Sequence, residues 1–133
     1  MKLNLSDEKS IYLQIGQMIE DDILRGVLLE EERAPSTNEL AKFYAINPAT
    51  AAKGINLLVD KGILYKKRGI GMFVQQGSKE KIIAERKEGF YRDYVLALMS
   101  EAKNLSITEQ ELIAMIRAAA KEEPSHNEGG YYV

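Results

Sequence analysis

The side chains best suited to chemistry in this sequence are cations, amides and hydroxyls gathered between residues 33 and 74. That segment holds seven basic and two acidic residues, a net charge of +5, in a chain whose overall net charge is −2. Its densest run is Lys66, Lys67 and Arg68, although an isolated basic run most often marks only a solvated surface. Groups of these kinds bind phosphates and the edges of bases. The pattern therefore favours a nucleic-acid ligand over a catalysed reaction.

The residues that catalysis or metal binding requires are scarce. The chain has no cysteine, and its one histidine, His126, lies in a polar stretch rich in helix breakers. Neither a thiolate metal site nor a triad with a structured histidine fits this composition, so we expect no enzyme activity, no metal and no cofactor. There is also no long apolar run and no signal peptide, so a soluble cytoplasmic protein without a membrane span is expected.

Two short helices are predicted to position the polar residues. Ser36 and Glu39 have the spacing of a capping box, which predicts a helix beginning directly after Ser36. Asn47 as the capping residue and Pro48 at the first helical position predict a second helix, which ends at Gly62. So few residues separate the two helices that they must cross steeply. This is the geometry of a helix-turn-helix, whose second helix enters the major groove.

After Gly62 the sequence period changes from helical to extended. Two short apolar runs, 63–65 and 72–74, flank the basic residues and a glycine-rich turn at 69–71. This predicts a β-hairpin with a cationic tip that can reach phosphate or the minor groove. The expected fold class is mostly α with a small β-hairpin, a winged helix-turn-helix followed by a two-helix C-terminal element.

These motifs, in this order, resemble the GntR family of bacterial transcription regulators. The resemblance is carried by residues 35–41, 46–53, 62–64 and 68–74, and it extends over roughly residues 10 to 75. The form Asn-Pro-x-Thr-x-x-Lys, with only a short segment after the wing, is similar to the YtrA-like subfamily. The resemblance implies a DNA-binding transcription regulator whose C-terminal helices serve for dimerisation.

The sequence also departs from the family pattern. GntR-like proteins usually have a Pro-Gly turn where this chain has Glu30 and Glu31, which predicts a looser turn, and acids at 30–32 would repel phosphates if they faced DNA. Asn38 stands where relatives commonly carry a DNA-contacting arginine, and asparagine favours adenine where arginine favours guanine. An exposed polar residue without a DNA role is an equal alternative for Asn38. A second hypothesis is therefore a winged-helix protein-interaction module that has lost DNA binding.

Helical spacing divides the second helix of the motif into two faces. The residues predicted to pack inward recur at intervals of three and four: Ala51, Gly54, Ile55 and Leu58. A glycine inside a helix costs about 0.5 to 1 kcal/mol relative to alanine, which close packing of Gly54 against the first motif helix would explain. On the outward face, Lys53 and Asn56 are the expected polar readers of bases. The residues predicted to contact DNA are Ser36, Asn38, Asn47, Ala49, Thr50, Ala52, Lys53, Asn56, Lys67, Arg68 and Gly69.

A further helix is predicted before the motif. It begins at Ser10, after an extended arm at residues 2–9, carries apolar residues at three- and four-residue spacing, and stops at Gly26. The apolar stripe is expected to be core. The acidic residues 20–22 are expected on the solvent face.

The C-terminal segment is predicted to be a pair of amphipathic helices. The first covers about residues 78–102, and Thr108 with Glu111 forms a capping box that opens the second. Two such helices cannot bury both apolar stripes against each other, so a partner surface is implied. The residues predicted to form a dimer interface are Phe90, Tyr91, Tyr94, Val95, Leu98, Leu112, Ile113 and Ile116.

The chain is thus expected to have three parts: a DNA-binding domain at residues 1–76, a dimerisation segment at 77–121 and a disordered tail at 122–133. The leading hypothesis is a homodimeric repressor that binds a palindromic operator in double-stranded DNA. A small-molecule effector stays undecided, because about fifty residues of helix leave little room for a pocket of several hundred Å³.

Overall fold

The structure is a computed structural model that describes residues 8–122, in two compact units that meet within one helix between Ala84 and Glu85. Residues 8–84 are called the N-terminal unit below and residues 85–122 the C-terminal unit. The arm was predicted at residues 2–9 and the tail at 122–133, but residues 8 and 9 belong to a helix and Glu122 ends another. Residues 2–7 and 123–133 lie outside the described residues.

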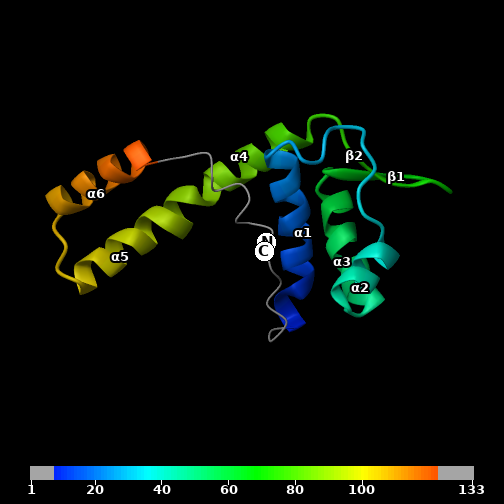
Figure 1. The fold of residues 1–133 in the computed structure, drawn as a ribbon, viewed down its shortest axis with the longest axis horizontal. Helices are drawn as coiled ribbons and strands as arrows, with labels where there is room; N and C mark the ends of the chain where they lie inside the picture. The colour runs from blue at the N-terminus through cyan, green and yellow to red at the C-terminus, as the bar shows by residue number, and fades with distance from the viewer. Residues whose placement is uncertain (1–7, 123–133) are drawn as a thin grey trace. The chain divides into compact units, whose positions relative to one another are not determined.

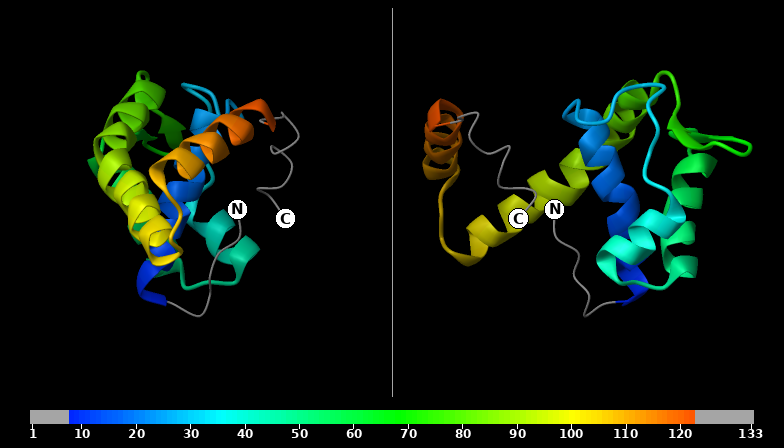
Figure 2. Two further views of the ribbon diagram at one scale, coloured as in Figure 1. Left: turned by 90° about the vertical axis from the view of Figure 1, so that its left-hand side faces the viewer. Right: turned by 45° about the vertical axis from the view of Figure 1, so that its right-hand side comes forward.

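The N-terminal unit combines a three-helix cluster with a β-hairpin and the first turns of a fourth helix (Figure 1). Its elements are α1 (Glu8–Leu24), α2 (Thr37–Tyr44), α3 (Pro48–Asp60), β1 (Leu64–Lys67), β2 (Gly71–Val74) and the start of α4 (Ser78–Phe90). The strands pair antiparallel, with Leu64 opposite Val74 and Lys67 opposite Gly71. Helix α1 lies on one side of α3, and the hairpin projects on the other (Figures 1 and 2). This confirms the predicted winged helix-turn-helix.

The core of the N-terminal unit is built from the predicted apolar stripes. Helix α1 begins two residues before the expected Ser10, and its stripe is buried, with α3 as the main neighbour of the helix. The largest fully buried apolar side chains of the described residues all belong to this unit: Ile15, Ile19, Ile55, Leu58, Leu64, Val74 and Ile82. A core drawn from every element gives the unit a fixed shape, on which exposed side chains can be placed accurately.

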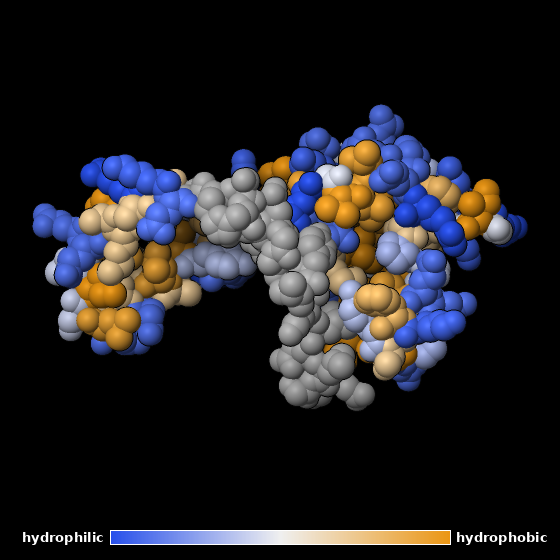
Figure 3. All heavy atoms as spheres, in the orientation of Figure 1, coloured by the Kyte–Doolittle hydropathy of each residue, from blue (hydrophilic) through white to orange (hydrophobic). Residues whose placement is uncertain are grey.

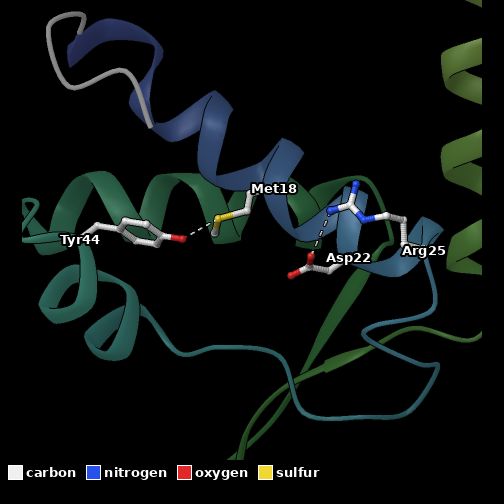
Figure 4. Close-up of polar contacts among 4 residues, drawn as sticks. All are labelled: Met18, Asp22, Arg25 and Tyr44. Atoms are coloured by element: carbon white, nitrogen blue, oxygen red, sulfur yellow. Dashed lines mark hydrogen bonds and ion pairs between the residues drawn. The ribbon is translucent and has the colours of Figure 1, made fainter. Parts of the chain in front are cut away.

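Helix α2 is also fastened to α1 by a polar contact. The Tyr44 hydroxyl donates a hydrogen bond to the Met18 sulfur over 2.8 Å, and Figure 4 shows the two side chains pointing toward each other from α2 and α1. Burial, with a smaller contribution from the charge of Asp22, raises the pKa of Tyr44, so the donor stays protonated. Asp22 itself pairs with Arg25 within α1 at 3.6 Å (Figure 4).

The expectation that the acids of α1 all face solvent is wrong for Glu20. Glu20 is only 5% exposed, and its carboxylate lies 3.4 Å from the ammonium of Lys61, the C-cap of α3. A carboxylate tolerates such burial when a cation compensates its lost hydration. The pair therefore ties α1 to the end of α3, a tertiary relation that spacing along one helix could not reveal.

Gly54 is explained by close packing, but against a different helix from the one expected. A Cβ built on Gly54 would lie 2.8 Å from the Tyr12 carbonyl oxygen and 2.9 Å from Ile15 Cβ, both in α1. Real Cβ atoms do not approach backbone so closely, so only glycine lets α1 and α3 meet here. The expected partner, the helix after Ser36, is not among the closest contacts.

The turn at residues 30–32 is fixed by hydrogen bonds to several other segments. The Gly77 N–H donates to Glu30 over 2.6 Å, the Tyr65 hydroxyl donates to Glu31, and the Leu29 N–H donates to Glu32 over 2.7 Å. The backbone beside it is fixed to β2, since the N–H of residue 31 donates to the carbonyl of residue 74 at 2.8 Å. All three carboxylates are therefore engaged with the protein.

The described part of the C-terminal unit consists of helices, with a short non-helical connection at residues 105–108. It contains the end of α4, a π-helical turn η1 (Tyr91–Val95), α5 (Leu96–Asn104) and α6 (Glu109–Glu122). The predicted capping box of α6 is confirmed, because Thr108 Oγ1 accepts from the Glu111 N–H at 3.1 Å and Glu111 accepts from the Thr108 N–H at 2.8 Å. The π-helical turn inside the predicted helix was not anticipated.

Apolar side chains of the C-terminal unit are largely exposed. Among its described residues only Ala102 and Leu112 are buried hydrophobics, and apolar atoms lie among the hydrophilic ones on the face in view (Figure 3). Seven of the eight predicted interface residues are exposed or half-buried, whereas Leu112 is buried, at 7% exposed. No helix within residues 8–122 is long and apolar enough to cross a membrane.

Candidate nucleic-acid interface

The N-terminus of α2 presents a capped helix end with an exposed amide beside it. Ser36 Oγ accepts from the Glu39 N–H at 3.0 Å, and the Ser36 N–H donates to Glu39 at 2.8 Å. These bonds to Ser36 hold the pKa of Glu39 below its ordinary value. The Ser36 hydroxyl proton is still able to donate, and Asn38 is exposed in the first turn. Both can approach a phosphate or a base from this end.

Helix α3 offers small side chains and a few polar ones on its outward face. Asn47 Oδ1 caps the helix by accepting from the Ala49 N–H at 2.8 Å, which leaves its NH₂ group able to donate. The other predicted contact residues of α3 divide by accessibility: Ala49, Lys53 and Asn56 are exposed, whereas Thr50 and Ala52 are half-buried. The inward face is as predicted, with Ala51, Gly54, Ile55 and Leu58 buried.

Lys53 has a neighbour that the sequence did not point to. Its ammonium lies 4.1 Å from the centroid of the Tyr12 ring on α1, within the range of a cation–π contact. Tyr12 is half-buried and 41 residues away along the chain. Only the crossing of α1 over α3 brings the two together.

The hairpin ends in an exposed three-residue loop with two cations beside it. Gly69 has φ of +78°, a conformation that favours glycine, and the Ile70 N–H closes the loop on the Lys67 carbonyl at 2.9 Å. Arg68 is exposed, while the Lys67 ammonium lies 4.2 Å from the centroid of the Phe73 ring. The loop thus presents backbone and positive charge without a bulky side chain at Gly69.

Arg33 adds a further cation to those of the hairpin, Lys66, Lys67 and Arg68, and it was not among the predicted contact residues. It forms an isolated β-bridge with Phe73, and a Cβ placed on Gly71 would lie 3.0 Å from Arg33 Nε. The guanidinium therefore packs on the hairpin, in a place that the φ of +144° at Gly71 leaves open. Arg33 belongs to the basic segment of the sequence, but no spacing rule connects it with a strand forty residues later.

The electrostatics of this unit suit a polyanion. Exposed cations of this unit lie on α2, α3, the hairpin and the start of α4, whereas the acids at 30–32 accept hydrogen bonds from the protein. The hydrogen bond to Glu31 raises the pKa of Tyr65. These hydrogen bonds fix the positions of the three exposed carboxylates, but a carboxylate that accepts a hydrogen bond keeps its negative charge. Within the described part of the chain, no group of three or more acidic or histidine side chains is placed to hold a metal ion.

Comparisons with known proteins agree with this architecture. Residues 11–74 match the family model described as bacterial regulatory proteins, gntR family. The solved structure of a GntR-family regulator from Bacteroides thetaiotaomicron is 37% identical with a TM-score of 0.66, and the match covers 86% of this chain and 99% of that one.

Two regulators from Bacillus subtilis are similar over most of their length. The HTH-type transcriptional regulator YhcF is 29% identical over 117 residues, which cover 88% of this chain and 95% of YhcF. The HTH-type transcriptional repressor YtrA is 27% identical over 107 residues, which cover 80% of this chain and 82% of YtrA. The chain therefore belongs to the GntR family of bacterial transcription regulators, in its small YtrA-like form, and is a DNA-binding regulator and not an enzyme.

Proposed function

We propose that this protein is a homodimeric repressor that binds a palindromic operator. The observation that carries the proposal is the apolar surface of the C-terminal unit. The side chains of Phe90, Tyr91 and Tyr94 are each more than half exposed, and Leu98, Ile113 and Ile116 are exposed as well. Burying such surface is favourable by roughly 25 cal/mol per Å². A second copy of the same surface is the partner that we propose.

Dimerisation would also serve DNA recognition. One winged helix covers few base pairs and buries a limited area, so two copies on one duplex are needed for high specificity. A two-fold axis through the C-terminal unit would make the interface self-complementary and the operator palindromic, with half-sites about one helical turn apart.

We propose repression because a dimer bound over a promoter excludes RNA polymerase without any further activity. The similar protein YtrA is named as a repressor. The alternative is a protein-interaction module without DNA binding, and the exposed acids at 30–32, each of which accepts a hydrogen bond from the protein, remain a feature that favours it.

The direct test has two measurements on the full-length protein. Sedimentation at micromolar concentration is expected to give a dimer, and footprinting on the promoter of its own gene is expected to give one protected palindrome. A monomer that still protects its site tightly as a single copy would contradict the dimer and the palindrome together.

The proposed wing contact has its own test. Replacing both Lys67 and Arg68 by alanine should weaken binding to specific and random DNA alike and lower the slope of log affinity against log salt, by roughly 0.9 for each lost phosphate contact. Lys103→Ala with Arg117→Ala removes the same charge from the C-terminal unit and is the matched control. Equal affinity and slope for the wing variant and the wild type would show that the wing does not touch DNA.

A further inference from the structure

Tyr12 of α1 lies next to Lys53, the one basic residue of α3. The Lys53 ammonium lies 4.1 Å from the Tyr12 ring centroid, although Lys53 is itself exposed on the outward side of its helix. The two helices touch at this level, because a Cβ on Gly54 would meet the Tyr12 carbonyl oxygen at 2.8 Å. The missing side chain at Gly54 thus brings the Tyr12 turn of α1 next to Lys53.

The contact restricts a side chain that would otherwise move freely. A lysine side chain is a flexible chain of four carbons, and the negative face of an aromatic ring attracts its ammonium group. The ring occupies only one side of the ammonium, so the remaining N–H donors still face outward. Lys53 can therefore bind DNA without leaving Tyr12, and part of its ordering is complete before DNA arrives.

The direction of the contact decides what Lys53 can reach. Tyr12 belongs to the helix that covers one side of α3, while the hairpin projects on the other side (Figures 1 and 2). A Lys53 held over the ring leans toward the α1 edge of α3. For a helix lying in a major groove, the centre of the outward face meets base edges and its edges meet the sugar-phosphate backbone.

We propose that Tyr12 is a positioning residue that turns Lys53 away from the bases and holds it for a backbone phosphate. This inference builds on the proposed operator binding through α3. It replaces the prediction that Lys53 reads a base, and it leaves Asn56 and Asn38 as the polar residues for base recognition.

The first measurement needs no change at Tyr12. Proton chemical shifts of the Lys53 ε-methylene in the free full-length protein should be displaced upfield by the ring current, and the displacement should persist when operator DNA is added. Ordinary lysine shifts in the free protein would overturn the contact, and loss of the displacement on the operator would overturn its role in the complex.

The second measurement is a double-mutant cycle on operator affinity. Lys53→Met should lower affinity about tenfold and lower the salt slope by about one, with the selected consensus sequence unchanged. Tyr12→Leu should lower affinity about twofold to fivefold, Tyr12→Phe should retain it, and Tyr12→Leu should add nothing in the Lys53→Met background. Urea unfolding of each variant serves as the control for folding.

Two results would overturn the role of Tyr12 while the operator remains. One is a base pair whose preference changes in Lys53→Met, which makes Lys53 a base reader. The other is an equal loss from Tyr12→Leu with and without Lys53, which makes its effect independent of the lysine. Failure of the wild type to select any sequence would instead overturn the proposed operator binding, and this inference with it.

Discussion

The two units of this protein use the same local rules but bury their apolar side chains to different degrees. Both contain a helix opened by a capping box, Ser36 with Glu39 in α2 and Thr108 with Glu111 before α6. In the N-terminal unit, α1, α3, the hairpin and the start of α4 all supply side chains to one closed core. In the C-terminal unit only Ala102 and Leu112 are buried hydrophobics. Local signals thus form a helix, whereas a closed core depends on how many neighbours cover it.

The largest effect should come from a charge placed on the exposed surface of the C-terminal unit. Tyr94 is 63% exposed and stacks on Phe90 with ring centroids 5.4 Å apart. If a partner covers it, Tyr94→Asp buries a charge and should raise the dimer dissociation constant about thirtyfold or more. Sedimentation equilibrium measures this change.

The control is an equally exposed aromatic residue of the other unit. Phe43 on α2 is 80% exposed and contacts Tyr44 with ring centroids 4.8 Å apart. Phe43→Asp should leave the dimer intact. If both variants dissociate, or neither does, the two surfaces do not differ in the way we propose.

The next effect tests how tightly the N-terminal core is closed. Gly54→Ala adds a Cβ at 2.8 Å from the Tyr12 carbonyl oxygen, and it should destabilise folding by about 1 to 3 kcal/mol despite the better helix propensity of alanine. Urea unfolding at fixed protein concentration measures the difference.

Gly16 offers the matched control in the helix on the other side of the same contact. A Cβ there would meet its nearest atoms at 3.6 and 3.7 Å, which is ordinary contact distance. Gly16→Ala should therefore be neutral or stabilise by about 0.5 to 1 kcal/mol. Equal effects of the two substitutions would argue against a close approach specific to Gly54.

A third prediction tests whether base recognition belongs to the N-terminal unit and not to the C-terminal unit. If Asn38 contacts a base, Asn38→Arg should move the selected consensus from adenine toward guanine at one pair, with discrimination of about 1 to 3 kcal/mol. Asn104→Arg makes the same change in the C-terminal unit and should leave the consensus as it was. An unchanged consensus for both variants would assign Asn38 no role in reading bases.

The smallest effect compares the two capping boxes by pH. Hydrogen bonds from the backbone and hydroxyl of Ser36 and of Thr108 lower the pKa of Glu39 and of Glu111. A lowered pKa in the folded state means that the stabilisation is complete above the ordinary value near 4.5 and is lost as pH falls through the folded value. Unfolding midpoints between about pH 6 and pH 3 should therefore fall more steeply in the wild type than in Glu39→Gln with Glu111→Gln. Parallel curves would mean that neither box contributes.

The features predicted correctly from the sequence were those that depend on residues close together in the chain. The two capping boxes, Pro48 at the start of α3 and the turn at Gly69 depend on residues at most a few positions apart. Their geometry follows from backbone hydrogen bonding and allowed dihedral angles, so a local pattern is sufficient.

The missed features are relations between distant segments. Glu20 with Lys61, Lys53 with Tyr12, and Arg33 with the hairpin each join residues about forty positions apart. Helical periodicity assigns each of them to a surface, but it does not say which other element covers that surface. Glu30 and Glu31 are further examples, because their hydrogen-bond partners, Gly77 and Tyr65, lie more than thirty residues later in the chain.

The π-helical turn at Tyr91–Val95 has a consequence for how such regulators diverge. A turn of this kind contains one residue more than the α-helical ladder around it, and removing that residue restores an α-helix. Each residue corresponds to about 100° of rotation along an α-helix. The π-helical turn accommodates its extra residue locally, so a single-residue deletion within residues 91–95 is expected to leave the apolar side chains of α5 on the same side of the helix. A change of one residue in chain length is thus better tolerated at this turn than elsewhere in the helix, where it would rotate the residues that follow by about 100°.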